Sequence, residues 1–331
     1  MKEFKKTFFE AVRSNLIIII IFSIFLALET YQLDYSVYSP GGLINVDERI
    51  GNKLYTSSGS FNMTYVSYRK GTLMNLIIAK ILPSHDIIKN DDITMSNEDI
   101  IDTLKRDAIL IEQAVSNATY ISSKYANKDI KIVSEDDYIY YIVPDANTNL
   151  RVGDKLLSCD NKDISQYDAL HECIASHKPG DTVNNKVLRN NKVINTTSTV
   201  LDDNILGIVI NKIFNYEKEV NLTYKYDANE SGSSGGLMLA LSMYNALVEE
   251  DITKGLKIAG TGTIEIDGSV GEIAGIKYKI FGAAKNNIDL FIVPSNNYEE
   301  AKEVVENNNL NIKLLKADNF EQVLNDLKNY N

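Results

Sequence analysis

The C-terminal part of the chain contains hydroxyl groups and lysines that could do covalent chemistry. Residues 206–331 hold none of the three histidines and neither of the two cysteines of the sequence. A Ser-His-Asp triad or a Cys-His pair therefore cannot be assembled from this segment alone. Any nucleophile here must be Ser or Thr, and lysine is the remaining candidate for its base.

A serine-rich turn directly precedes an apolar helical stretch in the segment 230–240, which reads Glu-Ser-Gly-Ser-Ser-Gly-Gly-Leu-Met-Leu-Ala. At a helix N-terminus, unpaired N–H groups and the positive end of the helix dipole can stabilise an oxyanion. We expect the backbone around Gly232, Ser233 and Gly235 to serve in this way. The same turn could instead bind a phosphate or be a flexible linker.

A second segment, 258–280, carries glycine pairs, a threonine and two lysines. Its Thr261-Gly262, Asp267-Gly268, Val270-Gly271 and Ile273-Ala-Gly-Ile-Lys277 look like the Thr-Gly and Gly-Gly-Leu-Lys segments of Lon-type serine proteases. The resemblance implies a Ser-Lys dyad, with Ser234 as the nucleophile, Lys277 as the base and Thr261 as a hydroxyl that orients the lysine. The 43 positions between Ser234 and Lys277 also fit that family.

The serine turn departs from the family at two positions. The family usually has Gly-Pro-Ser-Ala-Gly where this chain has Gly232-Ser233-Ser234-Gly235-Gly236. Without proline the approach to the helix is less rigid, and Ser231 and Ser233 become nominal alternatives for the nucleophile. We choose Ser234 because it keeps the register against Lys277 and the downstream helix.

Lys279 competes with Lys277 for the role of base. On a helix that begins near Ile276, positions 277 and 279 point about 200° apart, so only one of them can face the serine. The resemblance selects Lys277, and we expect Lys279 to be a solvated surface charge. A base must be neutral, so apolar neighbours have to lower the lysine pKa from about 10.4. The expected neighbours are Ile273, Ala274, Ile276 and Ile280.

A β-rich region precedes this part of the chain. The residues Gly153-Asp154, Leu156-Leu157, Asp160 and Ile164, followed by a helix-like stretch at 167–176 and strands near Val187 and Val193, resemble a PDZ domain. The resemblance implies that an extended peptide is bound by addition to a sheet edge. A small β-rich spacer with Gly-Asp turns is the alternative. Cys159 and Cys173 in this region could form a disulfide or be two small buried side chains.

These patterns predict an α+β multidomain chain with four parts. Residues 1–31 are a cytoplasmic stub and transmembrane anchor, and residues 32–128 are a small α/β N-terminal domain with a long helix at about 97–124. Residues 129–203 are the PDZ-like domain. Residues 204–331, where helices and strands alternate, are the Lon-type α/β proteolytic domain.

The only long apolar run, Leu16 to Leu28, follows a basic segment. Thirteen residues are short against the roughly 20 that span a bilayer, so a cleaved secretion signal is the competing interpretation. With its flanks the stretch 14–31 contains one charged residue, Glu29, and it lacks a signal-cleavage pattern. We therefore expect an uncleaved single-pass anchor in the cell membrane, with the N-terminus cytoplasmic and the catalytic body extracellular.

Composition excludes several classes of partner. The formal net charge is −11, so binding of nucleic acid through a basic face is not expected. The sequence contains no Gly-x-x-x-x-Gly-Lys-Ser/Thr, so we expect no nucleotide. The histidines and cysteines lack ligand spacing, so we expect no metal, and no other cofactor is implied.

Together these observations predict an ATP-independent, membrane-anchored serine endopeptidase. The resemblance to membrane-bound, PDZ-containing Lon-like proteases of bacteria implies secreted or membrane-associated peptides or unfolded proteins as substrates, including signalling peptide precursors, with a peptide segment held by the PDZ-like domain. The alternative function is a catalytically inactive, membrane-anchored PDZ scaffold.

Overall fold

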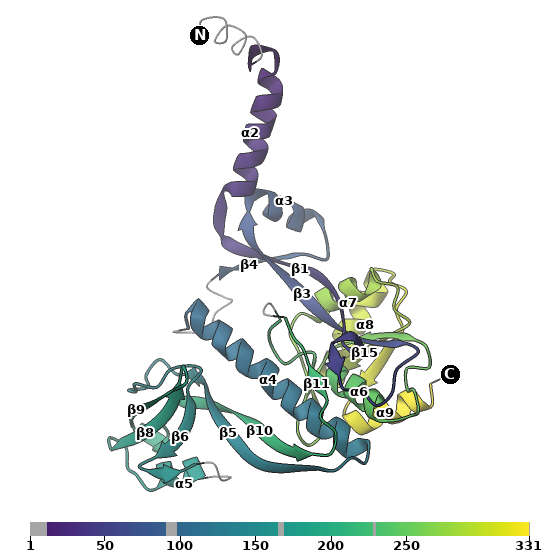
Figure 1. Cartoon of the computed structure of the whole chain (residues 1–331). Helices are drawn as coiled ribbons and strands as arrows, with labels where there is room; N and C mark the ends of the chain where they lie inside the picture. Colours follow the sequence, from purple (N-terminus) through teal and green to yellow (C-terminus); the bar gives the residue numbers. More distant parts are fainter. Residues whose placement is uncertain (1–11, 91–97, 165–168, 228–229, 331) are drawn as a thin grey trace, which may run out of the picture.

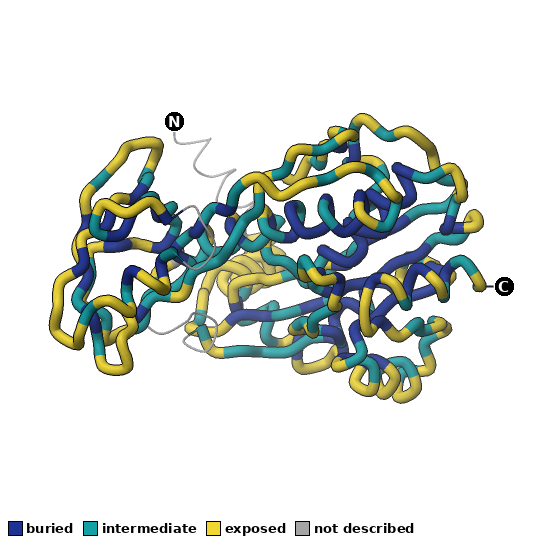
Figure 2. Tube along the Cα trace, turned by 90° about the horizontal axis from the view of Figure 1, so that it is seen from below, coloured by how far each residue is buried: buried dark blue, intermediate teal, exposed yellow. Residues whose placement is uncertain are grey.

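The computed structural model describes residues 12–330 except 91–97, 165–168 and 228–229. Figure 1 shows two lobes that share one long helix, α4, and an N-terminal helix, α2, that projects away from them. The larger lobe contains the C-terminus. Buried positions are concentrated in the strands and helices of this lobe, with a second set in the smaller lobe (Figure 2).

A six-stranded sheet forms the centre of the larger lobe, in the order β16-β15-β12-β3-β1-β4. Its strands are β1 (Gln32–Asn45), β3 (Ser60–Thr72), β4 (Asp86–Lys89), β12 (Lys257–Gly260), β15 (Leu290–Pro294) and β16 (Leu314–Ala317). The pairs β3–β12, β12–β15 and β15–β16 are parallel, whereas β1 runs antiparallel to both β3 and β4. The sheet is therefore mixed, with its parallel half from the C-terminal part of the chain.

The pairing of β3 with β12 corrects the predicted domain organisation. Ser60 lies opposite Lys257, and Met63 lies opposite Gly260, so the segment predicted as a separate N-terminal domain supplies half of the proteolytic sheet. The physical reason is that β12 is apolar on both faces. Without β3 it would be an edge strand with unpaired backbone groups, and buried parallel strands need partners on both sides.

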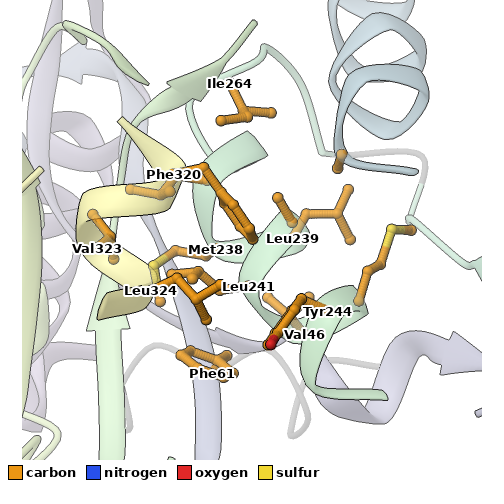
Figure 3. Packing of buried hydrophobic residues seen from close by; sticks show 14 of the residues in the cluster. Val46, Phe61, Met238, Leu239, Leu241, Tyr244, Ile264, Phe320, Val323 and Leu324 are labelled. Carbon is orange, nitrogen blue, oxygen red and sulfur yellow. The ribbon is translucent and has the colours of Figure 1, made fainter. Parts of the chain in front are cut away.

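Helices cover both faces of this sheet. On one face lie α6 (Gly236–Leu247), α9 (Phe320–Lys328) and part of α4, and on the other lie α7 (Ile276–Ala284) and α8 (Tyr298–Asn307). Because side chains alternate along a strand, Ile258 belongs to the first apolar cluster and Ala259 to the second. Figure 3 shows the first cluster, in which Phe61 of β3 lies beneath side chains of α6 and α9.

A short helix and two pairs of two-residue strands also belong to this lobe. The helix α3 (Leu73–Ile81) follows β3, and Thr72 caps it by accepting a hydrogen bond from Asn75 N. Two-residue strands form two antiparallel pairs, β2 (Ile50–Gly51) with β11 (Thr223–Tyr224), and β13 (Thr263–Ile264) with β14 (Val270–Gly271). The β2–β11 pair ties the chain that leads to the serine turn to the N-terminal half of the sheet.

The long helix α4 (Ile100–Tyr125) lies between the two lobes. Asp99 begins it by accepting hydrogen bonds from Ile101 N and Asp102 N. Toward the smaller lobe, Ser116 Oγ donates to Phe214 O at 3.0 Å. Toward the larger lobe, Asn117 Nδ2 donates to Ile264 O at 2.9 Å. Adjacent residues of one helix thus hold both lobes.

The smaller lobe is a sheet in the order β10-β5-β6-β8-β9, with β7 paired to β6. Its elements are β5 (Ile130–Ile142), β6 (Lys155–Cys159), β7 (Lys162–Asp163), α5 (Ala169–Ala175), β8 (Thr182–Arg189), β9 (Lys192–Thr199) and β10 (Ile208–Lys218). Cys159 and Cys173 are bonded as a disulfide that joins β6 to α5. The PDZ-like domain was predicted to end at residue 203, but β10 pairs along β5 and extends the sheet to residue 218.

The predicted transmembrane helix is the second correction to the fold class. The apolar segment forms α2 (Leu16–Thr30), which has 15 residues. At 1.5 Å per residue it extends about 22 Å, less than the roughly 30 Å of a bilayer core. Among the helices of the described residues, none combines the length and the apolar character that a membrane crossing requires.

Candidate active site

A cavity of about 1170 Å³ lies where the N-terminal strands, α4, the serine turn and α7 meet. Leu43, Met63 and Tyr65 line it from β1 and β3, and Ile111 and Ala114 line it from α4. Nearly half of the lining residues, 13 of 28, precede the serine turn by more than a hundred positions. The serines and lysines of the cavity wall are Ser231, Ser234, Lys277 and Lys279.

Ser234 lies on the turn directly before α6. Every residue of α6 is buried, so the helix is fixed in the core and its N-terminus is held at the cavity. Gly235 is the N-cap, and in the described part of the chain no side chain caps this helix. Ser234 is consequently presented at a rigid helix terminus with its hydroxyl in the cavity.

Lys279 contacts Ser234 from the first turn of α7. Its Nζ lies 2.8 Å from Ser234 Oγ and 2.9 Å from Thr261 Oγ1. The residue is only 3% exposed, and burial lowers the pKa of Lys279 to about 8. No carboxylate of a described residue forms an ion pair with it, so nothing holds the proton on the amine against this desolvation.

Thr261 links the serine and the lysine. It follows β12 directly and is completely buried. Its hydroxyl donates to Ser234 O at 2.9 Å and accepts from Lys279 Nζ, while Gly262 N also donates to Ser234 O at 2.8 Å. The hydroxyl proton of Thr261 is therefore committed to the serine carbonyl, and its oxygen is free to orient the amine.

Lys277 does not face the serine, which corrects the choice of lysine made from the sequence. Its Nζ lies 2.7 Å from Asp86 Oδ2 of β4, on the other side of α7 from Ser234. The two lysines do project in opposite directions, as the helical geometry requires. The lysine that contacts Ser234, however, is Lys279. Lys279, expected to be a solvated surface charge, is the buried one.

A pattern in the sequence could have identified Lys279. The buried apolar residues Ile276, Ile280 and Ala283 define the inner face of α7. Position 279 lies three residues after the first and four before the last, so it shares that face, whereas position 277 does not. The glycine spacing of the family signature favours Lys277, whereas the helical periodicity of the buried residues favours Lys279.

The turn before α6 has the backbone donors of an oxyanion hole. In the part of the chain that the structure describes, none of the N–H groups of residues 231–235 donates a hydrogen bond. Gly232 has a φ of +81°, a conformation that favours glycine. Gly232, Ser233 and Gly235 thus lie beside Ser234, and their N–H groups have no acceptor among the described residues. Ser231 instead lies near Asp107 of α4. Burial raises the pKa of Asp107, and the hydrogen bond with the Ser231 hydroxyl acts in the opposite direction.

Met63 explains the glycine at position 235. A Cβ added to Gly235 would lie 2.5 Å from Met63 Sδ. The thioether of β3 therefore occupies the space that an alanine methyl would need. This contact and the one from Asp86 were missed by the sequence analysis, because both residues lie in a segment that the sequence assigned to another domain.

Comparison with known proteins identifies two domains in the chain. Residues 203–329 match the Lon protease (S16) C-terminal proteolytic domain, and residues 121–200 match the PDZ domain. The chain therefore contains a Lon-type proteolytic domain, which is a serine peptidase domain, together with a PDZ domain. The Met63 and Asp86 contacts come from outside both matched regions.

Curated relatives match over a short part of the chain. Lon protease 2 of Herpetosiphon aurantiacus is 30% identical over 95 residues, which are 29% of this chain and 11% of that protein. The Lon protease of Aster yellows witches'-broom phytoplasma is 27% identical over 94 residues, 28% of this chain and 12% of that protein. The Lon protease of Rickettsia prowazekii is 26% identical over 95 residues, with shares of 29% and 12%. The chain spans about a tenth of the length of these relatives.

Proposed function

We propose that this protein hydrolyses peptide bonds with Ser234 as the nucleophile and Lys279 as the general base. The observation that carries the proposal is the 2.8 Å contact between Lys279 Nζ and Ser234 Oγ in a buried site. A serine hydroxyl is a weak nucleophile until a neighbouring base removes its proton. Lys279, with a pKa lowered to about 8, is neutral in a useful fraction of molecules near neutral pH.

The reaction follows from these contacts in two halves. In the first, Lys279 takes the Ser234 proton as Oγ attacks the substrate carbonyl carbon, and the same proton passes to the leaving amine when the peptide bond breaks. In the second, Lys279 takes a proton from water, which attacks the acyl ester, and returns it to Ser234 Oγ as the carboxylate product leaves. Thr261 keeps the amine directed at Oγ throughout.

The free N–H groups of the serine turn would stabilise the tetrahedral intermediate. Donors at a helix N-terminus act on developing negative charge, and the loss of one such donor in other hydrolases lowers kcat by about 10²–10³-fold. Gly232, Ser233 and Gly235 are the candidates, since they are adjacent to Ser234 and their N–H groups have no acceptor among the described residues.

The proposed substrates are extended peptides or unfolded proteins, cleaved without nucleotide. The printed sequence holds no phosphate-binding loop, and the PDZ domain supports capture of a peptide segment by addition to a sheet edge. β10 and β9 are the two terminal strands in the order of this sheet, so each offers an edge to which a peptide strand could be added. Capture of a peptide segment by this domain would supply substrate to the site without an ATP-driven motor.

The proposed location of the catalytic body is outside the cytoplasm. The Cys159–Cys173 disulfide supports this, because structural disulfides form and persist in oxidising environments. Secreted peptides, including signalling precursors, are then the accessible substrates. Trapping free thiols in intact cells, followed by electrophoresis without reductant, would detect the bridge, and its absence in the native protein would remove this support.

The central test is covalent labelling of Ser234. A fluorophosphonate should label the purified chain at Ser234 and abolish hydrolysis of a short fluorogenic peptide. Ser234→Ala should remove both labelling and hydrolysis. The matched control variant, Ser231→Ala, should retain both. A chain that binds peptides but neither reacts with the probe nor cleaves would be a PDZ scaffold, and the proposed function would be wrong.

A further inference from the structure

Asp86 makes two contacts with the helix that carries the base. Its Oδ2 accepts hydrogen bonds from Lys277 Nζ at 2.7 Å and from Tyr278 OH at 2.8 Å. Asp86 is the first residue of β4 and lies opposite Tyr38 of β1. The Tyr38 ring in turn lies 6.0 Å from the ring of Tyr278. Strands β4 and β1, at one edge of the six-stranded sheet, therefore hold the start of α7. They do so through the carboxylate of Asp86 and the ring contact between Tyr38 and Tyr278.

The charge state of Asp86 suits this role. Burial acts to raise the pKa of Asp86, but the hydrogen bonds from Lys277 and Tyr278 outweigh it and lower the pKa below its usual value. Asp86 is therefore an anion at neutral pH, and hydrogen bonds to an ionised acceptor are stronger than those between neutral groups.

The first turn of α7 needs such external contacts. It follows Gly275, whose φ is +75°, and no described side chain caps it. Upstream, Asn297 fixes Ile273 through two hydrogen bonds, one to its N–H and one to its carbonyl oxygen. In the first turn itself, Ile276 packs in the core and Lys279 bonds Ser234 on the inner side. The outer side of the turn is held by the contacts of Lys277 and Tyr278 with Asp86.

The geometry of the helix couples this anchor to the base. Side chains at positions 277 and 279 project about 200° apart, so Asp86 and Ser234 contact opposite sides of the same turn. A rotation of the turn about its axis would move Lys279 Nζ away from Ser234 Oγ. The contact on the outer side opposes that rotation, while the amine on the inner side stays free to exchange a proton.

We propose that Asp86 is a positioning residue for Lys279. By holding the outer side of the first turn of α7, it fixes the helix rotation that brings the amine onto the serine. This inference rests on the proposed function, and it adds a residue that lies outside the region 203–329 matched by the proteolytic domain. The strand β4 is thereby part of the catalytic apparatus without touching the reacting atoms.

The test compares Asp86→Ala, Lys277→Met and the double variant in the full chain. Each single variant breaks the same ion pair, so each should lower kcat for a short peptide, and KM should stay close to that of the wild type. The expected decrease is about 10–100-fold, the range seen when a catalytic group is displaced by about 1 Å. The double variant should be hardly worse than either single variant. Labelling of Ser234 by a fluorophosphonate should slow by the same factor, because this probe needs no peptide subsite.

A conservative variant and a surface control keep the outcome readable. Asp86→Asn retains an acceptor for Tyr278 but loses the charge, so its kcat should lie between those of Asp86→Ala and the wild type, even if the alanine variant folds poorly. Glu306→Gln, at an exposed position of α8, should match the wild type. Circular dichroism would verify folding of each variant.

Two results would overturn the inference. If Asp86→Asn and Lys277→Met fold and keep wild-type kcat and labelling, Asp86 does not position the base. If they raise KM while labelling is unchanged, Asp86, which is 44% exposed in the cavity wall, is a substrate-binding residue instead. Ser234→Ala separates these results from a failure of the proposed function, since its activity must vanish whatever Asp86 does.

Discussion

Lys277 and Lys279 lie two positions apart in α7 and serve opposite sides of it: the Nζ of Lys279 is 2.8 Å from Ser234 Oγ, and the Nζ of Lys277 is 2.7 Å from Asp86 Oδ2. The amine of Lys279 is buried and has no carboxylate partner among the described residues, whereas the amine of Lys277 is a partly exposed member of an ion pair. Burial disfavours the protonated form of Lys279. Only Lys279 is therefore equipped to act as a base.

Replacement of each lysine by methionine should give unequal losses of activity. Lys279→Met should abolish hydrolysis, because it removes the proton acceptor, whereas Lys277→Met should leave measurable turnover. Thr261→Val should fall between them, since it removes orientation of the amine and not the amine itself. Initial rates on a short peptide would decide. Loss of all activity in Lys277→Met alone, with Lys279→Met active, would reverse the assignment.

The pH dependence of the rate should report the Lys279 amine. Burial lowers the pKa of Lys279 to about 8, and the base must be neutral, so kcat/KM should rise about tenfold per pH unit below 8 and level off above it. Initial rates and fluorophosphonate labelling from about pH 6 to 10 should share this profile. A midpoint near the ordinary lysine value of about 10.4 would contradict a buried base.

Replacement of Lys279 by methionine should stabilise the fold while it abolishes activity. Between about pH 8 and 10.4 the unfolded chain binds a proton at this lysine that the folded chain does not, so wild-type stability rises with pH across that window. Below pH 8 the folded protein carries a buried charge. Lys279→Met should therefore raise the free energy of unfolding by about 1–3 kcal/mol at pH 7. The loss of the hydrogen bonds from Lys279 to Ser234 and Thr261 reduces this gain.

Chemical denaturation at pH 7 and at pH 10 would test this prediction. The advantage of Lys279→Met should be smaller at the higher pH, while Lys302→Met, at an exposed position of α8, should change stability by less than about 0.5 kcal/mol at both. A variant with Met at 279 that is equally destabilised at both pH values would show that the amine is not desolvated in the fold.

A methyl group at position 235 should disturb the nucleophile turn through Met63. A Cβ there would approach Met63 Sδ to 2.5 Å, so Gly235→Ala should lower stability by about 1–3 kcal/mol through overpacking. Met63→Ala in the same chain should relieve the contact and restore part of the loss. Thermal denaturation of the two singles and the double would measure this coupling. Additive losses would mean that the two positions do not interact.

The disulfide should stabilise the PDZ domain without a direct role in catalysis. Cys159 and Cys173 are 14 positions apart, and a loop of this size is stabilised by about 3 kcal/mol when it is closed. Reduction, or the double change to serine, should lower the unfolding temperature of the PDZ domain. Hydrolysis of a short peptide should be unchanged, because the bridge is far from Ser234 in the fold. A parallel fall of kcat would contradict this separation.

Much of the catalytic apparatus could be predicted from the sequence because its signals are local. The absence of histidine after residue 206, the serine before an apolar helix and Thr261 after a buried strand each concern a few neighbouring residues. In the structure Ser234 and Thr261 lie together as expected, although their catalytic roles remain a proposal. The choice between Lys277 and Lys279 failed because alignment to a signature ignored which face of the helix is buried.

The long-range features could not be read in this way. Nothing near Ser60 indicates that it will lie opposite Lys257, because a strand partner is chosen by burial of the whole sheet and not by adjacent residues. For the same reason Met63 and Asp86 were assigned to another domain. The length of α2 was misjudged because flanking residues were counted with the apolar run, whereas the helix itself has 15 residues.

The parallel pairing of β3 with β12 has a consequence for biosynthesis. β3 leaves the ribosome about 200 residues before its partner, a delay of about 10–40 s at ordinary elongation rates. During that time Met63 and Asp86 have neither Ser234 nor Lys279 beside them. The proposed catalytic site can therefore assemble only after the C-terminal strands have been synthesised and paired with β3.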